Sequence, residues 1–243
     1  MTAPARASEA SVRHLALPLG PDFAPYVWTD PPDVVAARHG VRPELVLRYD
    51  QNTPPLPGVP QIPLAESMGR VHEYPDGGYR ELCSAAAHYA GLQAENVVIG
   101  AGADDLILLS ARVFLGSGRR AAIAEPTYSM YRIATRLTGA EVVDGDEQAE
   151  LVWRCNPENP AGTIVEPEEL ADLARGRPES IVVVDEAYYE YSGRSCAPWV
   201  DELPNLVVVR TLSKAFGFAG LRIGYALAHP DTAALLNERR APA

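Results

Sequence analysis

The sequence predicts an α/β protein, with a three-layer doubly wound sheet of mostly parallel strands as its fold class. Short runs that are apolar on both faces and rich in β-branched residues, such as SIVVVDE (180–186) and NLVVVRT (205–211), are typical of parallel strands covered by helices on both sides. These runs alternate with helical segments, which implies βαβ crossovers. The composition, 47% hydrophobic and 22% charged, is that of globular proteins.

Two regions of the chain differ in proline content and in the regularity of their hydrophobic patterns. Residues 1–60 are predicted to form an irregular N-terminal arm, because many of the 22 prolines lie there and exclude long helices and central strands. Residues 61–243 are predicted to form the large domain. Its patterns predict helices over 79–92, 101–115, 127–140 and 166–176, and strands over 96–100, 120–125, 141–143, 151–155, 180–186, 205–211 and 222–228.

Charge and cysteine usage exclude several classes of protein. The net charge of -11 argues against nucleic acid and anionic membranes as partners. No window approaches the length of an uncharged membrane helix, and residues 1–14 lack the apolar segment of a secretory signal. The three cysteines, Cys83, Cys155 and Cys196, are widely spaced and predict neither a zinc site nor a disulfide framework. We therefore expect a cytoplasmic protein without a bound metal.

Lys214 is the only lysine in the chain, beside 20 arginines. Arginine stays charged and cannot act as an amine nucleophile, whereas lysine can lose its proton and attack a carbonyl to form a Schiff base. Two interpretations remain open from the count alone. Either the amine itself is required at this position, or a composition that favours arginine has missed one site.

The carboxyl ends of the predicted strands are where ligands bind in such sheets. The segment GAGADD follows the first strand and starts a helix. Free backbone N–H groups of Gly102, Ala103 and Asp104 would form an anion site at the helix N-terminus. The alternative is an ordinary tight connection in which Asp104 is the N-cap.

Two further strands end in polar residues. Asp185 leaves a buried strand and needs a cation or hydrogen bonds, so it either holds a protonated pyridine nitrogen or caps the next turn. Tyr188 follows three residues later and taken alone is a routine aromatic residue. Asn159 lies in the turn NPENPAG, where it either donates its amide to a ligand oxygen or belongs to a plain loop.

The segment TLSKAFGFAGLRIG is the most informative. Thr211, Ser213 and Lys214 cluster at a strand end, and Arg222 follows at the start of the next strand. Hydroxyls, a guanidinium and a helix N-terminus together form a phosphate pocket. An amine beside that pocket indicates a phosphorylated cofactor with a carbonyl group. Pyridoxal 5′-phosphate meets these demands, including an acid for its ring nitrogen.

Six segments in this order resemble those of the pyridoxal-phosphate-dependent aminotransferases of fold type I, class I/II, and within them most those of the histidinol-phosphate aminotransferases. The resemblance covers about residues 50–230. The segments are YPDGGYRELCSAAAHYAG, GAGADDLILL, EPTYSMY, NPENPAG, VVVDEAYYEY and RTLSKAFGFAGLRIGY.

The resemblance implies a role for each site residue. Three would be catalytic: Lys214 forms the Schiff base and moves a proton, Asp185 keeps the ring nitrogen protonated, and Tyr188 bonds the ring oxygen. The others would bind the cofactor: Asn159 at the ring oxygen, Tyr128 on the ring face, and Ala103, Asp104, Thr211, Ser213 and Arg222 at the phosphate. Tyr74 would reach the phosphate of a neighbouring subunit, which implies a homodimer.

The implied reaction is transamination between a phosphorylated amino compound, such as histidinol phosphate, and 2-oxoglutarate. Two alternatives remain open: a decarboxylase of the threonine-phosphate type, and a catalytically silent remnant that binds the cofactor. The chain departs from the family twice. It ends at LLNERRAPA, so we expect it to be truncated before the small C-terminal domain that carries the arginine for the substrate carboxylate. In QNTPPLPG the substrate-facing Asn52 matches the family, whereas Thr53 and Pro54 do not.

Overall fold

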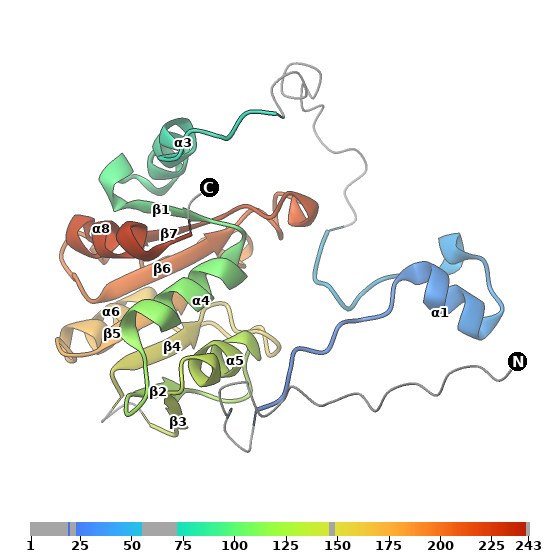
Figure 1. Cartoon of the computed structure of the whole chain (residues 1–243), viewed down its shortest axis with the longest axis horizontal. Coiled ribbons are helices and arrows are strands. Elements are labelled where there is room, and N and C mark those ends of the chain that lie inside the picture. The colour runs from blue at the N-terminus through green and yellow to red at the C-terminus, as the bar shows by residue number, and fades with distance from the viewer. Residues whose placement is uncertain (1–18, 20–22, 55–71, 146–148, 242–243) are drawn as a thin grey trace, which may run out of the picture.

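A seven-stranded sheet forms the centre of the computed structural model (Figure 1), which describes residues 19, 23–54, 72–145 and 149–241. Six of the seven strands are buried along most of their length, and β3 is the exception. The strands are β1 (Val97–Gly100), β2 (Arg120–Ile123), β3 (Glu141–Val143), β4 (Leu151–Cys155), β5 (Ile181–Asp185), β6 (Leu206–Thr211) and β7 (Gly224–Ala228).

The strand order is β1-β7-β6-β5-β4-β2-β3. The neighbours from β6 through β5, β4 and β2 to β3 are parallel, and β7 pairs antiparallel with both β1 and β6. The predicted doubly wound, mostly parallel sheet is therefore confirmed. The exception has a local reason: the connection from β6 to β7 contains only the short 3₁₀ helix η5 (Ala219–Leu221) and no crossover α-helix, so the chain returns in the opposite direction.

Helices cover both faces of the sheet (Figure 1). Side chains of α4, α5 and α8 form one buried apolar cluster with the sheet, and side chains of α3 and α6 form the other. No helix among the described residues is both long and apolar enough to cross a membrane. The helix bounds are α3 (Arg80–Ala90), α4 (Ala103–Phe114), α5 (Met130–Leu137), α6 (Pro167–Arg175), α7 (Tyr189–Ser192) and α8 (Pro230–Arg239), with 3₁₀ helices η3 (Ala94–Asn96) and η4 (Ala197–Trp199).

The helix ends follow local sequence signals. Gly91 adopts a left-handed conformation (φ 74°) and closes α3, as its position predicted. In α4 the acidic residues Asp104 and Asp105 lie in the first turn and Arg112 in the last, which suits the helix dipole. Each predicted helix is present, although α5 is shorter than the predicted 127–140, because residues 127–129 are not helical and the helix ends before the turn at Gly139.

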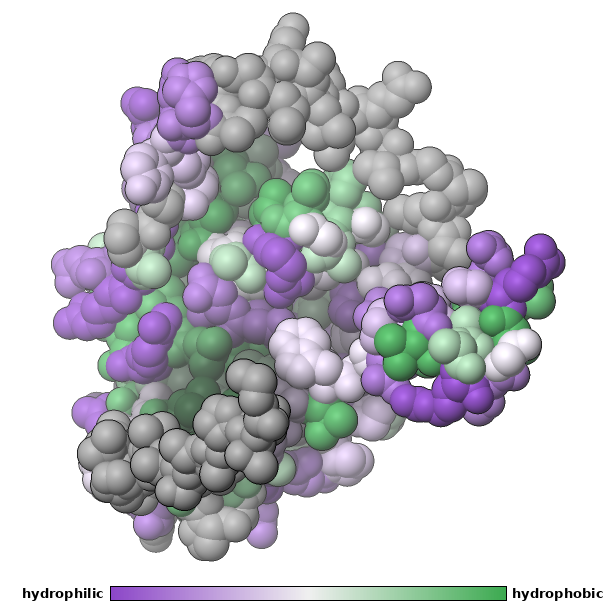
Figure 2. All heavy atoms as spheres, turned by 45° about the vertical axis from the view of Figure 1, so that its right-hand side comes forward, coloured by the Kyte–Doolittle hydropathy of each residue, from purple (hydrophilic) through white to green (hydrophobic). Residues whose placement is uncertain are grey.

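The N-terminal arm contains a helix that the sequence analysis missed. Helix α1 (Pro32–His39) begins with a proline in its first turn and ends at Gly40 in a left-handed conformation, followed by η2 (Pro43–Leu45). The prolines were predicted to exclude long helices, and a helix of eight residues is compatible with them because proline at the first helical position is favourable. The α1 segment stands apart from the sheet in Figure 1, and in Figure 2 it is a lobe that mixes apolar and charged side chains. Residues 1–18, 20–22 and 55–60 of the predicted arm lie outside the described residues.

Candidate active site

A cavity of about 340 Å³ lies where β4, β5 and β6 end. The strand register places Cys155 beside Asp185, and Thr211 ends the next strand. The cavity brings together every site residue predicted from the sequence except Tyr74: Asn52, Ala103, Asp104, Tyr128, Asn159, Asp185, Tyr188, Thr211, Ser213, Lys214 and Arg222.

Asp185 is the buried acid of this cavity, with 3% of its surface exposed. Its Oδ2 accepts a hydrogen bond from the Tyr131 hydroxyl (2.8 Å), and its Oδ1 accepts one from the Ala187 amide (3.0 Å). The second bond is the turn cap that the sequence left open as an alternative. Burial raises the pKa of Asp185 to about 6, against the lowering effect of the two bonds. No lysine or arginine among the described residues forms an ion pair with it.

Lys214 faces the same cavity from the loop after β6. Its Nζ donates a hydrogen bond to the Gln51 carbonyl (2.7 Å) and lies 5.6 Å from the centre of the Tyr188 ring. Burial lowers the pKa of Lys214, while the charges of Asp104 and Asp185 act in the opposite direction. A lowered pKa increases the share of neutral amine, which is the form that attacks a carbonyl.

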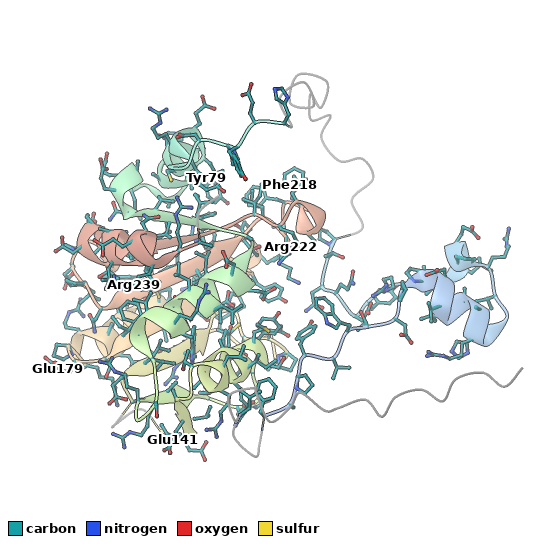
Figure 3. All side chains as sticks on the ribbon, in the orientation of Figure 1. Tyr79, Glu141, Glu179, Phe218, Arg222 and Arg239 are labelled. Atoms are coloured by element: carbon teal, nitrogen blue, oxygen red, sulfur yellow. The ribbon has the colours of Figure 1, made fainter. Side chains whose placement is uncertain are left out.

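An anion-binding corner lies beside the lysine. The Thr211 hydroxyl donates to Ser213 Oγ (3.0 Å), and Arg222 Nη1 approaches the same oxygen at 3.5 Å. The N-terminus of α4 adds the amides of Ala103 and Asp104, because the first amides of a helix have no intrahelical partner. Figure 3 shows Arg222 at the edge of the sheet that faces the arm.

The structure corrects two details of this corner. The Gly102 amide donates to the Gly100 carbonyl (2.9 Å), so it is not free to bind an anion. Gly102, and not Asp104, is the N-cap of α4. Glycine is required here, because its φ is 88° and a Cβ would lie 2.6 Å from Arg222 Nη2.

Tyr128 and Asn159 form further walls of the cavity. The Tyr128 hydroxyl donates to Asp104 Oδ1 (2.9 Å), which fixes the ring beside the helix N-terminus. Burial, followed by the charge of Asp104, raises the pKa of Tyr128. Asn159 also borders an adjoining hollow of about 320 Å³, so its turn lies between the cavity and this second hollow.

The N-terminal arm closes one side of the cavity. Asn52 Nδ2 donates to the Tyr188 hydroxyl (3.0 Å), and Asn52 holds a left-handed conformation with φ 51°. Arg48 links Asp50 to Thr29, which joins two stretches of the arm. Besides Asn52 and Thr53, the arm contributes cavity residues that the sequence analysis did not single out: Tyr26, Trp28, Thr29, Asp50 and Gln51.

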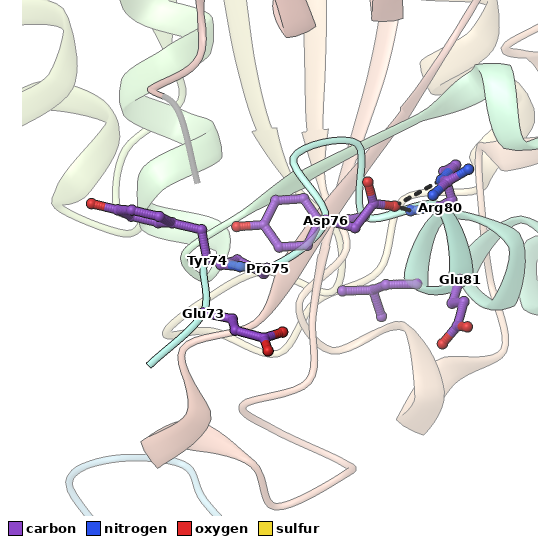
Figure 4. A pocket seen from close by; sticks show the side chains of 8 residues that line it. Glu73, Tyr74, Pro75, Asp76, Arg80 and Glu81 are labelled. Carbon is purple, nitrogen blue, oxygen red and sulfur yellow. Dashed lines mark hydrogen bonds and ion pairs between the residues drawn. The ribbon is translucent and has the colours of Figure 1, made fainter. Parts of the chain in front are cut away.

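Tyr74 lies elsewhere, with 91% of its surface exposed. It borders a larger and shallow hollow of about 1070 Å³, formed by residues 73–76 and 79–82 (Figure 4). Among the polar side chains there, Asp76 and Arg80 form a solvent-exposed pair (2.9 Å) that points away from Tyr74, and Glu73 and Glu81 carry further negative charge. Chemistry and not volume therefore identifies the smaller cavity as the candidate site. The reach of Tyr74 into a neighbouring subunit stays a prediction.

Metal-binding geometry is not found in the part of the chain that the structure describes, where no three His, Cys, Asp or Glu side chains form a group that could hold an ion. The three cysteines are buried and free. The cavity itself has a carboxylate at one end and hydroxyls, amides and a guanidinium at the other, which match an organic ligand with a cationic end and an anionic end.

Comparison with known proteins agrees with this geometry. The family model "Aminotransferase class I and II" matches residues 46–243. Histidinol-phosphate aminotransferase of Desulfitobacterium hafniense is 37% identical over 221 residues, which is 81% of this chain and 61% of that protein. Histidinol-phosphate aminotransferase 2 of Methylococcus capsulatus is 36% identical over 226 residues, with the same two shares. The chain therefore spans about three fifths of the length of these relatives.

Two solved structures extend the likeness. Histidinol-phosphate aminotransferase from Sinorhizobium meliloti, in complex with pyridoxal-5′-phosphate, superposes with a TM-score of 0.78 at 26% identity, covering 91% of this chain and 67% of that one. L-threonine-O-3-phosphate decarboxylase from Porphyromonas gingivalis superposes with a TM-score of 0.67 at 26% identity, covering 74% and 61%. Because the family model matches most of this chain, residues 46–243, the chain belongs to the class I and II aminotransferases.

Proposed function

We propose that this chain carries the cofactor and catalytic site of a pyridoxal-phosphate-dependent transaminase. The proposed amino compound is phosphorylated, such as histidinol phosphate, and the other pair is 2-oxoglutarate and glutamate. The names of the two similar relatives support this substrate class. The division into an arm (1–60) and a large domain (61–243), the cytoplasmic location and a homodimer completed by Tyr74 belong to the same proposal.

One observation carries the proposal: Asp185 is a buried carboxylate with no ion-pair partner in the described part of the chain, and it shares a cavity with the sole lysine. A buried charge without a partner is costly, so a ligand that brings a positive charge to this carboxylate is strongly favoured. A protonated pyridine nitrogen is such a charge, and the anion-binding corner suits the phosphate of the same ligand.

The residues of the cavity fit pyridoxal phosphate at both ends. Asp185 would hold the ring nitrogen, and the amides of α4 with Thr211, Ser213 and Arg222 would hold the phosphate. Tyr128 would lie against the ring face, and Tyr188 and Asn159 would bond the ring oxygen. When bound, the cofactor supplies an electron sink that stabilises negative charge on the substrate carbon.

Lys214 is the proposed nucleophile and proton carrier. Its amine is half-buried, which favours the neutral form that attacks the cofactor carbonyl and later accepts a proton from the substrate carbon. The Gln51 carbonyl accepts a hydrogen bond from Nζ and holds it at the cavity. Asn52 lies on the arm over Tyr188, where it is placed to face the substrate and exclude water.

The test uses the single lysine. The purified chain is mixed with pyridoxal phosphate, its visible absorption is recorded, and it is then reduced with borohydride and mapped by peptide mass. We expect a yellow band and a pyridoxyl adduct on Lys214. Lys214→Arg is the matched control, because it keeps the charge and removes the nucleophile. A folded wild-type chain that shows neither band nor adduct on Lys214 refutes the proposal.

A second candidate, decarboxylation, is favoured by the likeness to the threonine-phosphate decarboxylase structure. The same cofactor pocket serves both reactions. With histidinol phosphate or threonine phosphate as substrate, formation of glutamate from 2-oxoglutarate identifies transamination, and release of carbon dioxide identifies decarboxylation. An adduct on Lys214 without either product is expected of a silent cofactor-binding remnant.

A further inference from the structure

Tyr131 is the one side chain that donates a hydrogen bond to Asp185 among the described residues, and it was not among the site residues predicted from the sequence. Its hydroxyl lies 2.8 Å from Asp185 Oδ2, and the whole residue is buried. The ring does not line the cavity, so it cannot touch a bound ligand directly. Any effect of Tyr131 on chemistry must therefore pass through Asp185.

The tyrosine ring is held in place from a second side. It stacks almost parallel on Trp153 of β4, with ring centroids 5.3 Å apart and an interplanar angle of 11°. Trp153 Nε1 in turn donates to Thr135 Oγ1 (3.1 Å), and Thr135 lies on α5 about one turn after Tyr131. Helix α5 is thus tied to β4 and to the end of β5 by one chain of contacts. A buried ring with a partner on each side has a single orientation available for its hydroxyl.

A hydrogen bond of this kind has two consequences for a carboxylate. It fixes the rotation of the carboxyl group, and it favours the ionised form over the neutral one. Asp185 needs both, because burial and the nearby negative charges favour the neutral form. A neutral, freely rotating Asp185 would not hold a cation.

We propose that Tyr131 is a positioning residue of this site: its buried hydroxyl orients Asp185 as an ionised carboxylate that faces the positive end of the bound ligand. The proposal rests on the proposed function, in which that ligand is pyridoxal phosphate. Tyr131 acts without touching the ligand, which distinguishes it from Tyr128 in the cavity wall.

Several titratable groups surround Asp185 and enter any measurement of its ionisation. They come from every element packed against it: Asp104 of α4, Tyr128 and Tyr131 at the start of α5, Cys155 of β4, Glu186 and Tyr188 after β5, and Lys214 after β6. Since the groups other than Tyr131 are unchanged in a variant that alters only this tyrosine, the difference between wild type and variant isolates the hydroxyl.

The experiment is a carbon-13 NMR titration of the Asp185 carboxyl in the full 243-residue chain without cofactor, assigned with Asp185→Asn. In Tyr131→Phe we expect the pKa of Asp185 to rise by roughly one to two units, because a hydrogen bond to a charged group is lost. Tyr225→Phe is the matched control. Tyr225 is a second buried tyrosine, it packs in the cluster on the opposite face of the sheet, and its hydroxyl lies beside Arg210 and does not hydrogen-bond to Asp185.

An Asp185 pKa that stays constant in Tyr131→Phe overturns the proposal, and so does an equal rise in both phenylalanine variants, which would indicate general loosening. If Tyr131→Phe does not fold, 3-fluorotyrosine at position 131 gives a prediction of opposite sign. The fluorinated phenol is a stronger donor, so the pKa of Asp185 should fall, and an unchanged value overturns the proposal.

The loaded enzyme supplies a second readout. With pyridine-¹⁵N-labelled pyridoxal phosphate bound to wild type and to Tyr131→Phe, the nitrogen resonance should shift toward the unprotonated form only in the variant. An unchanged resonance contradicts the proposal. Failure of the proposed function is distinguishable, because it would appear as no adduct on Lys214, whereas the carboxyl titration needs no cofactor.

Discussion

Asp185 and Glu186 are neighbours in the chain and leave β5 toward opposite faces of the sheet. Both are buried, with 3% and 0% of their surfaces exposed. Asp185 faces the cavity, and among the residues that the structure describes its hydrogen-bond donors are the Tyr131 hydroxyl and the Ala187 amide. Glu186 faces the cluster of α3 and α6, where Arg210 pairs with it at 3.0 Å.

Both oxygens of the Glu186 carboxylate have hydrogen-bond partners. Its Oε1 accepts from the Cys196 amide (2.6 Å), and its Oε2 accepts from Ser195 Oγ (2.9 Å) and from Arg210. The guanidinium of Arg210 lies 3.7 Å from the centre of the Tyr189 ring. This buried ion pair holds the ends of β5 and β6 together. Because the two charges neutralise each other, neither is available to bind a ligand.

The difference between the two acids separates structural from functional burial. A carboxylate that serves the fold is neutralised by its own chain, whereas one that serves a ligand is left short of charge. Asp185 is of the second kind. Asp104 is intermediate between the two, because it pairs with Arg222 at the cavity rim and both side chains are about half exposed. The three predictions below concern these three carboxylates in turn, Glu186, Asp185 and Asp104. They are ordered by the expected change in unfolding free energy, from the largest to the smallest.

The largest change is expected for Arg210→Met. Removing the cation leaves Glu186 buried and unpaired, so the unfolding free energy should fall by about 3–5 kcal/mol. Urea denaturation of the cofactor-free chain at pH 7 measures it. The double variant Glu186→Gln with Arg210→Met should recover part of the loss, because the unpaired charge is gone. Equal losses in the single and double variants would show that packing, and not charge, dominates this face.

Asp185→Asn should act in the opposite direction on the cofactor-free chain. The folded pKa of Asp185 is raised from 3.8 to about 6, so the folded state holds a proton that the unfolded state has lost. The unfolding free energy therefore decreases as pH rises through this window, by at most about 3 kcal/mol from this group. Asn removes that cost, so the variant should be more stable at pH 7 while it loses affinity for pyridoxal phosphate.

Urea denaturation of wild type and Asp185→Asn at several pH values between about 4 and 7 tests this prediction. The other titratable groups contribute equally to both chains, so the difference in unfolding free energy reports Asp185 alone. The two chains should differ little near pH 4 and most at pH 7. A wild-type chain that is the more stable of the two at pH 7 would mean that Asp185 is neutralised by its own chain after all.

The smallest change in stability is expected for Arg222→Met. Arg222 and Asp104 are 3.3 Å apart with 49% and 41% of their side chains exposed, so the pair contributes at most about 1 kcal/mol. Affinity for pyridoxal phosphate should nevertheless fall roughly tenfold or more, because a charged hydrogen bond to the phosphate is lost. Arg175→Met, which removes an exposed pair with Glu202, should leave the affinity unchanged when both are measured by absorbance titration.

Much of the candidate site follows from local patterns in the sequence. Asp185, Thr211 and Lys214 stand at the ends of apolar strands, and parallel strands bring their carboxyl ends to one edge. Gly102 needs a left-handed backbone before a helix, which marks the turn. Tyr131 could have been found from its spacing, because it lies three residues after Tyr128 and so shares its side of the helix start.

Other features depend on contacts between segments far apart in the chain. Gln51 meets Lys214 across more than 160 residues, and Asn52 meets Tyr188 across 136. No local pattern encodes such pairs, since they arise only when the arm folds back over the strand ends. The antiparallel insertion of β7 between β1 and β6 is of the same kind, because strand order is chosen by packing among alternatives that share one hydrophobic pattern.

The sequence by itself determined the alternation of strands and helices, the position of the single lysine and the acid at the end of β5, because these depend on side-chain periodicity and chemistry. Only the tertiary structure decided that Glu186 pairs with Arg210 while Asp185 has no ion-pair partner in the described part of the chain. Adjacent residues on a strand point to opposite faces, and which face carries an arginine depends on the neighbouring strand β6. Whether the Asp185 carboxylate has an ion-pair partner therefore depends on how the strands are arranged in the sheet.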